Sequence, residues 1–356
     1  MRRIYLVRHG KPDFPNDGHY CIGRTDIPLN TLGHLQGVLL GEWFRGKNIS
    51  KVFCSCLTRS KETAEYIADA EVLPGIEEHF AGEWDGLCFD EIRLRWSELY
   101  EKRGADPTVL LPGAESIADC MARFAAAVYD AIKNSEGDIV LVSHATVIQT
   151  YLCGILGRDI KGYKKVTLPY GSVTTLIYDG EGLYAESVGI PPQVDITFEL
   201  CSALMNAAGN EDKIIAHCRA VAHEALCLAE RLNRHGFTLD LNMIEHAALL
   251  HDIARRKKNH AELGAKWLSE LGFSDVADIV RQHEDMDFDG INEAAVVNIA
   301  DKCISETGKV SIDERFTRSA AKCVSDEAKA AHARKDETAK RIKAAVNAAC
   351  EEDIIK

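Results

Sequence analysis

The segment Ile4-Tyr5-Leu6-Val7-Arg8-His9-Gly10 decides how the first half of the chain should fold. A short apolar run rich in β-branched and aromatic side chains predicts a buried strand, and the glycine after Arg8 and His9 predicts a loop. Ligands of open α/β sheets bind at the carboxyl ends of the strands. His9 is therefore a candidate functional residue by its position alone.

Similar strand patterns recur through the first half. Residues 52–54 and 139–142 are β-branched or aromatic runs, and each is followed by a segment with helical spacing. This alternation predicts an α/β fold with a mostly parallel sheet and flanking helices. Two more strands are expected at residues 173–178 and 183–188, because the glycines of Asp179-Gly180-Glu181-Gly182 permit a hairpin turn between them.

A change in composition near residue 195 divides the chain. Two consecutive prolines in Gly189-Ile190-Pro191-Pro192-Gln193 stop helix and sheet, and no proline follows this segment. The 356 residues are enough for two domains, and a hydrophobic content of 46% is enough for two cores. We therefore predict an α/β domain over residues 1–194 and an all-α domain over residues 195–356.

Apolar residues beyond this boundary recur at helical spacing, which predicts a helical bundle. The expected helices cover residues 220–232, 244–253, 265–271, 276–280 and 294–304. The Ala- and Lys-rich tail at residues 326–349 has only a thin apolar stripe, so it either docks as a terminal helix or frays.

Charge and cysteine content restrict the partners and the compartment. A net charge of −13 disfavours nucleic acid and anionic membranes as partners. No apolar stretch reaches the ~18 residues of a transmembrane helix, and Met1 leads too quickly into a strand for a secretory signal. The twelve cysteines are dispersed, and Cys54 and Cys56 are too close for a redox C-x-x-C pair. We therefore expect reduced core thiols and a cytoplasmic protein, with the oligomeric state left open.

Cationic residues at strand ends can assist His9. A neutral imidazole can attack a phosphoryl group when cations offset the developing charge and an acid protonates the leaving oxygen. Arg8 is adjacent to His9, Arg59 follows the second strand, and His144 follows the third. Loops at one edge of a parallel sheet can converge, so these residues form a candidate phosphoryl-transfer site.

Three carboxylates are available as the acid. Glu78 begins a glycine-containing loop over residues 78–86 that can lie over the same edge of the sheet. Glu77 and Glu83 are close competitors. The residues alone leave the choice among them open.

At these positions the chain resembles the histidine phosphatase superfamily, also called phosphoglycerate-mutase-like, over residues 1–190. The resemblance rests on four elements in order: Arg-His-Gly after the first strand, Ser-x-Leu-x-Arg at residues 55–59, Gly-x-Trp-x-Gly at residues 82–86 with a Glu ahead of it, and a His after a later strand. It implies that His9 is the phosphorylated nucleophile and that Glu78 is the proton donor. It also implies that a substrate is bound by Arg8, Gly10, Arg24, Arg59 and His144.

Within this superfamily, residues 23–29 are most similar to α-ribazole phosphatases. Lys11-Pro12-Asp13 stands where mutases usually have Glu or Thr followed by Trp-Asn, and the segment of residues 87–112 is short. We therefore expect a phosphatase that acts on a small phosphorylated metabolite and needs no cofactor in this half. A mutase-type phosphotransferase is the alternative.

The pair His251-Asp252 indicates a second site, because it interrupts the apolar helical segment of residues 247–254. Such a pair is costly in a helix core unless it binds a metal or an ionic partner. Neighbouring helical segments supply further ligands, and the candidate set is His217, His251, Asp252, His260, His283 and Asp301. Imidazole and carboxylate ligands suit iron or manganese, and six exceed the needs of one catalytic ion. We therefore predict a dinuclear centre with Asp252 as a possible bridge, and we interpret His223, His235 and His246 as ordinary residues.

This half resembles the HD superfamily of metal-dependent phosphohydrolases over roughly residues 213–305. His217, His251-Asp252 and Asp301 correspond to its basic motif, and His260 and His283 resemble the extra pair of its diiron subset, which includes symmetrical diadenosine tetraphosphate hydrolases. The resemblance implies hydrolysis of a nucleotide or another phosphoanhydride, so the whole chain would be a bifunctional phosphohydrolase. A nucleotide sensor without turnover and a diiron oxygenase are the alternatives for this half.

Overall fold

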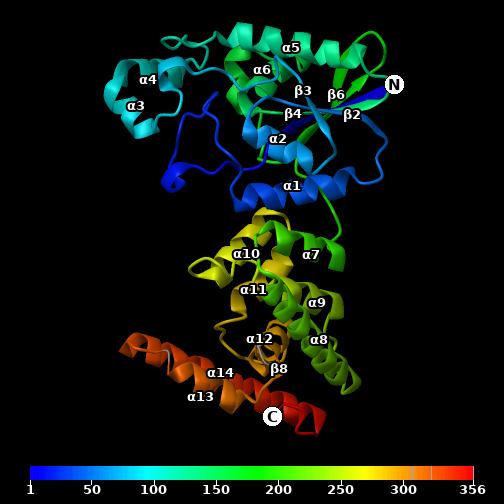
Figure 1. Ribbon diagram of the computed structural model, residues 1–356, viewed down its shortest axis with the longest axis vertical. Coiled ribbons are helices and arrows are strands. Elements are labelled where there is room, and N and C mark those ends of the chain that lie inside the picture. The colour runs from blue at the N-terminus through cyan, green and yellow to red at the C-terminus, as the bar shows by residue number, and fades with distance from the viewer. Residues whose placement is uncertain (306–307, 322, 356) are drawn as a thin grey trace. The chain divides into compact units, whose positions relative to one another are not determined.

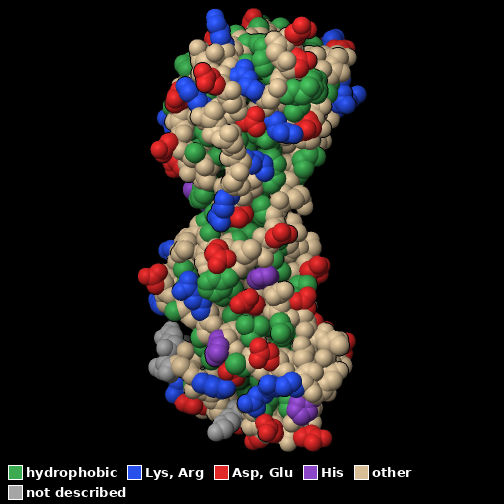
Figure 2. All heavy atoms as spheres, turned by 90° about the vertical axis from the view of Figure 1, so that its right-hand side faces the viewer, with side chains coloured by type: hydrophobic (Ala, Val, Ile, Leu, Met, Phe, Trp, Pro, Cys, Tyr) green, Lys and Arg blue, Asp and Glu red, His purple; other side chains and the backbone are tan. Residues whose placement is uncertain are grey.

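The computed structural model describes residues 1–305, 308–321 and 323–355. The chain divides into two compact units, Met1–Val194 and Asp195–Lys356 (Figure 1). Acidic and basic side chains are interspersed on the visible face of each unit (Figure 2). Among the described residues, no helix combines the length and the apolar character that crossing a membrane requires.

A six-stranded mixed sheet organises the first unit, in the order β3-β2-β4-β1-β5-β6. Its strands are β1 (Arg2–Arg8), β2 (Ile49–Cys54), β3 (Ala70–Val72), β4 (Asp138–Ser143), β5 (Val173–Tyr178) and β6 (Leu183–Ile190). The first four strands in space are parallel, β5 pairs with β1 in antiparallel orientation, and β6 pairs antiparallel with β5. The predicted mostly parallel sheet and its hairpin are therefore confirmed, and β3 is an additional short strand at the edge.

Helices cover both faces of this sheet (Figure 1). One face carries α1 (Thr31–Phe44) and α2 (Thr58–Glu65), and the other carries α5 (Ile117–Lys133) and α6 (Ala145–Ile155). Helices α3 (Phe89–Arg95) and α4 (Ser97–Ala105) pack in a separate cluster around Trp84, and short 3-10 helices lie at Pro15–Asp17, Gly82–Trp84 and Ile160–Lys165. Successive side chains of a strand point to opposite faces. Accordingly, Ile4 and Leu6 pack in a core with α5 and α6, whereas Tyr5 and Val7 pack in a second core with α1 and α2.

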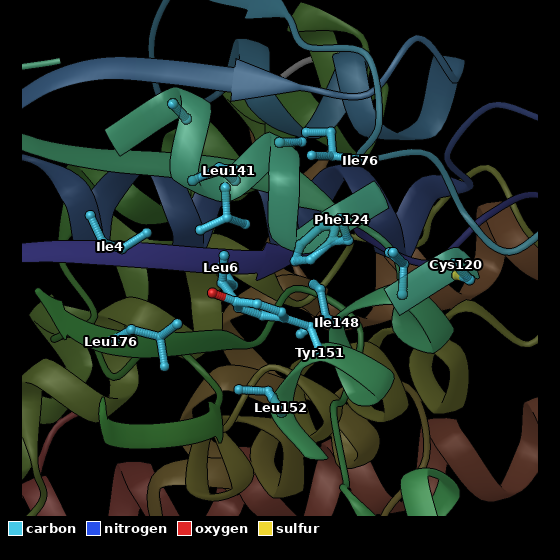
Figure 3. Close-up of a cluster of buried hydrophobic side chains, with 14 of the residues drawn as sticks. Ile4, Leu6, Ile76, Cys120, Phe124, Leu141, Ile148, Tyr151, Leu152 and Leu176 are labelled. Atoms are coloured by element: carbon cyan, nitrogen blue, oxygen red, sulfur yellow. The ribbon is translucent and has the colours of Figure 1, made fainter. Parts of the chain in front are cut away.

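The larger core lies between the sheet and the pair α5 and α6 (Figure 3). Leu6 and Leu141 from β1 and β4 meet side chains from the two helices. The rings of Phe124 and Tyr151 pack edge to face, with their centroids 5.3 Å apart. Because this core fixes β1 against β4, it also fixes the loops that follow these two strands.

The second unit is helical apart from one short two-stranded sheet. Its helices are α7 (Phe198–Ala207), α8 (Asp212–Arg234), α9 (Leu241–Leu250), α10 (His260–Glu270), α11 (Ser274–Gln282), α12 (Glu293–Cys303), α13 (Ile312–Ala320) and α14 (Asp326–Cys350), and its strands are β7 (Ile304–Ser305) and β8 (Gly308–Lys309). Helix α14 buries Ala339, Ile342 and Val346. The C-terminal tail is therefore a docked helix.

The end of α9 differs from the sequence-based expectation. Helical spacing predicts a helix through Ile253, but α9 ends at Leu250, and tighter turns follow it. In these turns the N–H groups of Ile253 and Arg255 donate to carbonyl groups only three residues earlier. The pair His251-Asp252 thus lies where the helix ends, and not inside it.

All twelve cysteines are free thiols. Seven of them are buried, which agrees with the expectation of core residues, but Cys56 and Cys227 are exposed. The prediction that every cysteine is a core thiol is therefore wrong at these two positions.

Candidate active sites

Strand pairing brings His9 and His144 together in the first unit. β1 and β4 are parallel neighbours, with Arg8 opposite Ser143. His9 and His144 are the next residues on these strands, and the backbone N–H of His9 donates to the carbonyl oxygen of Ser143 at 3.0 Å. Two histidines that are far apart in the sequence therefore leave the same edge of the sheet side by side.

One nitrogen of His9 is available as a nucleophile. His9 Nδ1 lies 2.7 Å from the carbonyl oxygen of Gly10, which can only accept, so Nδ1 carries the proton and Nε2 carries the lone pair. The side chain is buried, and burial followed by the positive charges of Arg59 and Arg8 lowers the pKa of His9 well below its ordinary value. The imidazole is therefore neutral near pH 7, as nucleophilic attack requires.

Two arginines flank this histidine. Arg59 Nε lies 3.3 Å from His9 Nε2, and its other nitrogens donate to the carbonyl oxygens of Thr25 and Gly23 at 2.9 and 2.7 Å. The Arg8 guanidinium lies over the ring of Tyr170, with Cζ 3.6 Å from the ring centroid. Arg8 Nε is buried and has no hydrogen-bond partner among the described residues. A buried donor without a partner fits an anionic ligand such as a phosphoryl group.

The geometry distinguishes the three candidate carboxylates. Glu78 is buried and accepts hydrogen bonds from the backbone N–H groups of Thr146 and Val147, in the first turn of α6, at 3.1 and 3.2 Å. This turn directly follows His144. Glu77 instead lies 3.6 Å from Arg123, and the side chain of Glu83 is exposed. Of the three carboxylates, Glu78 is therefore the one that contacts the turn after His144.

The other two predicted substrate residues are placed differently. Arg24 is partly exposed, and its guanidinium lies 3.5 Å from Glu115 and donates to the carbonyl oxygen of Glu78 at 3.4 Å. The N–H of Gly10 donates to Thr63 Oγ1 at 3.0 Å, so Gly10 has an internal partner. Arg24 therefore borders the site next to Glu78, and Gly10 connects β1 to α2.

Two residues that organise this site, Asp85 and Arg123, are not among the site residues predicted from the sequence. Asp85 accepts from the backbone N–H groups of Gly23, Arg24 and Thr25 at 3.0, 2.6 and 3.1 Å, which fixes the loop whose carbonyls hold Arg59. Arg123 donates to the carbonyl oxygens of Glu77 and Glu78 at 2.8 and 3.0 Å. Asp85 lies within the Gly-x-Trp-x-Gly motif, and that position could have pointed to it.

The six predicted metal ligands of the second unit lie together in two groups that share Asp252. In the first group, His217 Nε2 is 3.1 Å from Asp301 Oδ1, and His251 Nε2 is 3.7 Å from the same oxygen and 3.6 Å from Asp252 Oδ2. In the second group, Asp252 Oδ1 lies 3.1 Å from His260 Nε2 and 3.7 Å from His283 Nε2. The two oxygens of Asp252 thus face different histidines.

The chemistry of these donors fits metal ions. His251 Nδ1 and His283 Nδ1 each lie 2.7 Å from a backbone carbonyl oxygen, so these nitrogens carry the protons and both Nε2 lone pairs point at carboxylates. His251 Nε2 and Asp252 Oδ1 are buried and have no hydrogen-bond partner in the described part of the chain. Burial lowers the pKa of His283 to about 3, which keeps it neutral. Lone pairs that face each other in a buried site are stabilised by a cation between them.

The surroundings of this group include charged residues that the sequence analysis did not single out. Lys302 Nζ donates to Asp301 Oδ2 at 2.8 Å. Arg255 Nη1 lies 3.1 Å from His260 Nε2, and Glu284 Oε1 lies 3.6 Å from the same nitrogen. Each of these residues follows a predicted ligand within three positions in the sequence. That proximity is the feature of the sequence that could have pointed to them.

Comparisons with known proteins find matches in both halves of the chain. A model of the histidine phosphatase superfamily (branch 1) matches residues 4–191, and a model of the HD domain matches residues 214–305. The uncharacterized phosphatase PhoE of Bacillus subtilis (strain 168) is 30% identical over 167 residues, which are 45% of this chain and 80% of that protein.

Solved structures resemble the first unit. Bacillus stearothermophilus YhfR has a TM-score of 0.51 and 23% identity, over 53% of this chain and 98% of its own. The α-ribazole phosphatase from Shigella flexneri has a TM-score of 0.49 and 20% identity, over 55% of this chain and 100% of its own. The family model over residues 4–191 shows that the chain belongs to the histidine phosphatase superfamily of enzymes, with a match to the HD domain in its second unit.

Proposed function

We propose that the first unit is a phosphomonoesterase for a small phosphorylated metabolite and that His9 is its nucleophile. The observation that carries the proposal is the lone pair of His9 Nε2, which lies beside the positive charges of the buried Arg59 and the partly buried Arg8. Those charges compensate the charge of a transferring phosphoryl group. The roles that the family resemblance implies for Arg8, Arg59 and His144 agree with this arrangement.

The proposed reaction has two steps. His9 Nε2 forms a bond to phosphorus while the phosphorus–oxygen bond to the leaving alcohol breaks, and the alcohol oxygen takes a proton from Glu78. Water then attacks the phosphohistidine, Glu78 takes back a proton, and inorganic phosphate leaves with His9 restored. The hydrogen bonds that Glu78 accepts from the first turn of α6 support its role as the acid, because they hold the carboxyl group near the turn that follows His144.

Rapid quenching under alkaline conditions, in which phosphohistidine survives, tests this mechanism. The wild-type protein mixed with a phosphomonoester should contain acid-labile phosphate on a peptide that includes His9. Phosphate recovered on another residue would exclude the nucleophile. Phosphate delivered to a second alcohol in preference to water would favour the mutase-type alternative.

We propose that the HD domain hydrolyses a nucleotide or another phosphoanhydride and that it uses two iron or manganese ions. His217, His251, Asp301 and one oxygen of Asp252 would hold one ion, and His260, His283 and the other oxygen of Asp252 would hold the second. When bound, such ions polarise phosphoryl oxygens and acidify water. The observation that carries the proposal is the placement of the two Asp252 oxygens, 3.6 Å from His251 and 3.1 Å from His260.

The residues around these ligands support binding and orientation. Lys302 holds the Asp301 carboxylate in place through its hydrogen bond. Arg255 lies beside His260 and can compensate the charge of a substrate phosphate.

Metal analysis combined with turnover tests this second proposal. The purified protein should contain close to two transition-metal ions and should hydrolyse dinucleoside polyphosphates or related anhydrides. Bound metal and nucleotide without hydrolysis would favour a sensor. Oxygen consumption without phosphate release would favour a diiron oxygenase.

We propose a cytoplasmic location, with small molecules as partners and neither nucleic acid nor membrane among them. The twelve free cysteines and the net charge of −13 support this view.

A further inference from the structure

The hydroxyl group of Ser55 contacts the second histidine of the phosphatase site. Ser55 Oγ lies 2.7 Å from His144 Nε2, and both side chains are fully buried. We propose that Ser55 is a positioning residue that fixes the proton of His144 on Nδ1, so that this N–H donates to the transferring phosphoryl group. The inference rests on the proposed function of the first unit and adds a residue to it.

The direction of the hydrogen bond follows from the acceptors that the Ser55 hydroxyl can reach. The backbone N–H of Leu57 donates to Ser55 Oγ at 3.3 Å, so this contact does not use the hydroxyl proton. His144 Nε2 is the one acceptor that this buried proton has among the described residues, so the hydroxyl donates to it. A neutral imidazole has one N–H donor and one acceptor, so a proton received at Nε2 places the ring proton on Nδ1.

His144 is neutral in this environment. Burial, followed by the positive charge of Arg59, lowers the pKa of His144 well below its ordinary value. A doubly protonated ring would donate to Ser55 from Nε2, and the buried position disfavours that form. The hydrogen bond from Ser55 therefore selects one of two neutral tautomers.

The selected tautomer supplies a donor for which the protein has no acceptor. His144 Nδ1 is buried and has no hydrogen-bond partner within the part of the chain that the structure describes. The ring of His144 lies beside the ring of His9, with the centroids 4.9 Å apart. A phosphoryl oxygen at His9 Nε2 is the group that would satisfy this donor. In the other tautomer Nδ1 would present a lone pair to an anion and repel it.

Backbone and side-chain contacts hold Ser55 in position. Its N–H group donates to the carbonyl oxygen of Val142 at 3.2 Å and to Ser60 Oγ at 3.0 Å. Ser60 Oγ in turn donates to the same Val142 carbonyl at 2.7 Å. The position of the Ser55 hydroxyl is thus tied to β4, the strand that carries His144.

The direct test is the tautomer of His144 in the wild-type full-length protein. Two-dimensional ¹⁵N NMR with His144→Gln for assignment should show a protonated Nδ1 and an unprotonated Nε2. A protonated Nε2, in either a neutral or a doubly protonated ring, would overturn the proposal. This measurement needs no Ser55 variant and is independent of folding defects.

Kinetics provide the second test, with p-nitrophenyl phosphate as substrate. Ser55→Ala should lower kcat/KM about 10- to 100-fold, weaken competitive inhibition by vanadate, and give a mixture of tautomers at His144. Ser55→Thr keeps the hydroxyl and should restore most of the activity, and Ser50→Ala, an exposed serine on β2, serves as the control. Wild-type activity in folded Ser55→Ala would disprove the role of Ser55 but would leave the proposed function of the first unit intact. Wild-type activity in His9→Ala would instead disprove the proposed function.

Discussion

The imidazole rings of His9 and His144 lie with their centroids 4.9 Å apart and their planes at 58°. Each histidine directly follows a central parallel strand, and the pairing of Arg8 with Ser143 sets them in register. The proximity of the rings is therefore a property of the sheet. A shift of one residue in the register would point one ring to the opposite face and destroy the site.

His9→Ala should abolish the release of phosphate from p-nitrophenyl phosphate, with a loss of at least about 1,000-fold, because the variant lacks the nucleophile. A metal chelator should leave this activity in the wild-type protein unchanged. Steady-state assays with both proteins check the two expectations. Substantial hydrolysis by folded His9→Ala would require another nucleophile.

Glu78→Gln should slow hydrolysis most for substrates with poor leaving groups, because an alkoxide needs a proton and p-nitrophenolate does not. The comparison of kcat/KM for an alkyl phosphate and for p-nitrophenyl phosphate measures this difference. Glu83→Gln is the matched control, since its side chain is exposed outside the site. Equal losses for the two substrates would contradict the role of Glu78 as the acid.

In the pH profile of kcat/KM for p-nitrophenyl phosphate, the loss of activity on the acid side should have its midpoint below pH 6.5, the ordinary pKa of histidine. Burial, Arg59 and Arg8 lower the pKa of His9, so protonation inactivates the nucleophile only at a lower pH. Arg59→Gln removes one of the positive charges and should therefore raise the His9 midpoint in an NMR titration. A midpoint that falls or stays constant in this variant would show that Arg59 does not set the protonation of His9.

Asp252→Ala should remove metal from the HD domain and abolish its hydrolysis of phosphoanhydrides, while turnover of p-nitrophenyl phosphate persists. The reason is that both oxygens of Asp252 face predicted ligands. Elemental analysis and separate assays check the result, with Asp278→Ala as a control whose exposed carboxylate pairs with Arg281. Loss of both activities in folded Asp252→Ala would contradict two independent sites.

Gly82→Ala should destabilise the first unit more than Gly157→Ala. Both glycines have φ near +60°, so alanine at either position costs about 1–2 kcal/mol. A Cβ at Gly82 would also lie 2.1 Å from the carbonyl oxygen of Pro112, whereas a Cβ at Gly157 would meet nothing within 4 Å. We expect a loss of about 3 kcal/mol or more at Gly82 in urea unfolding followed by tryptophan fluorescence. Equal losses would mean that the Pro112 loop moves freely.

Local sequence was sufficient to predict every strand of the six-stranded sheet except β3 and to propose the residues of the phosphatase site. The alternation of β-branched runs with helical segments predicts the sheet, and His9, Arg59 and His144 follow strands whose ends meet at one edge. The three-residue strand β3 escaped prediction, because its few and largely exposed side chains carry no apolar pattern. It forms a strand through its pairing with β2.

Sequence spacing also failed where a helix and a turn share the same apolar pattern. Ile253 and Ala254 are buried like the residues of α9 before them, so periodicity extends the predicted helix past Leu250. The turns at His251-Asp252 instead direct the carboxylate toward His260, which begins the next helix.

The sequence by itself determined which residue types are present for phosphoryl transfer and metal binding, because motif order and periodicity are local properties of the chain. Only the tertiary structure placed Glu78, and not Glu77 or Glu83, against the turn that follows His144, left the lone pair of His9 on Nε2, and divided the two oxygens of Asp252 between different histidines. These features depend on hydrogen bonds and burial between segments far apart in the chain. Side-chain orientation is set by such contacts, and no spacing along the sequence encodes it.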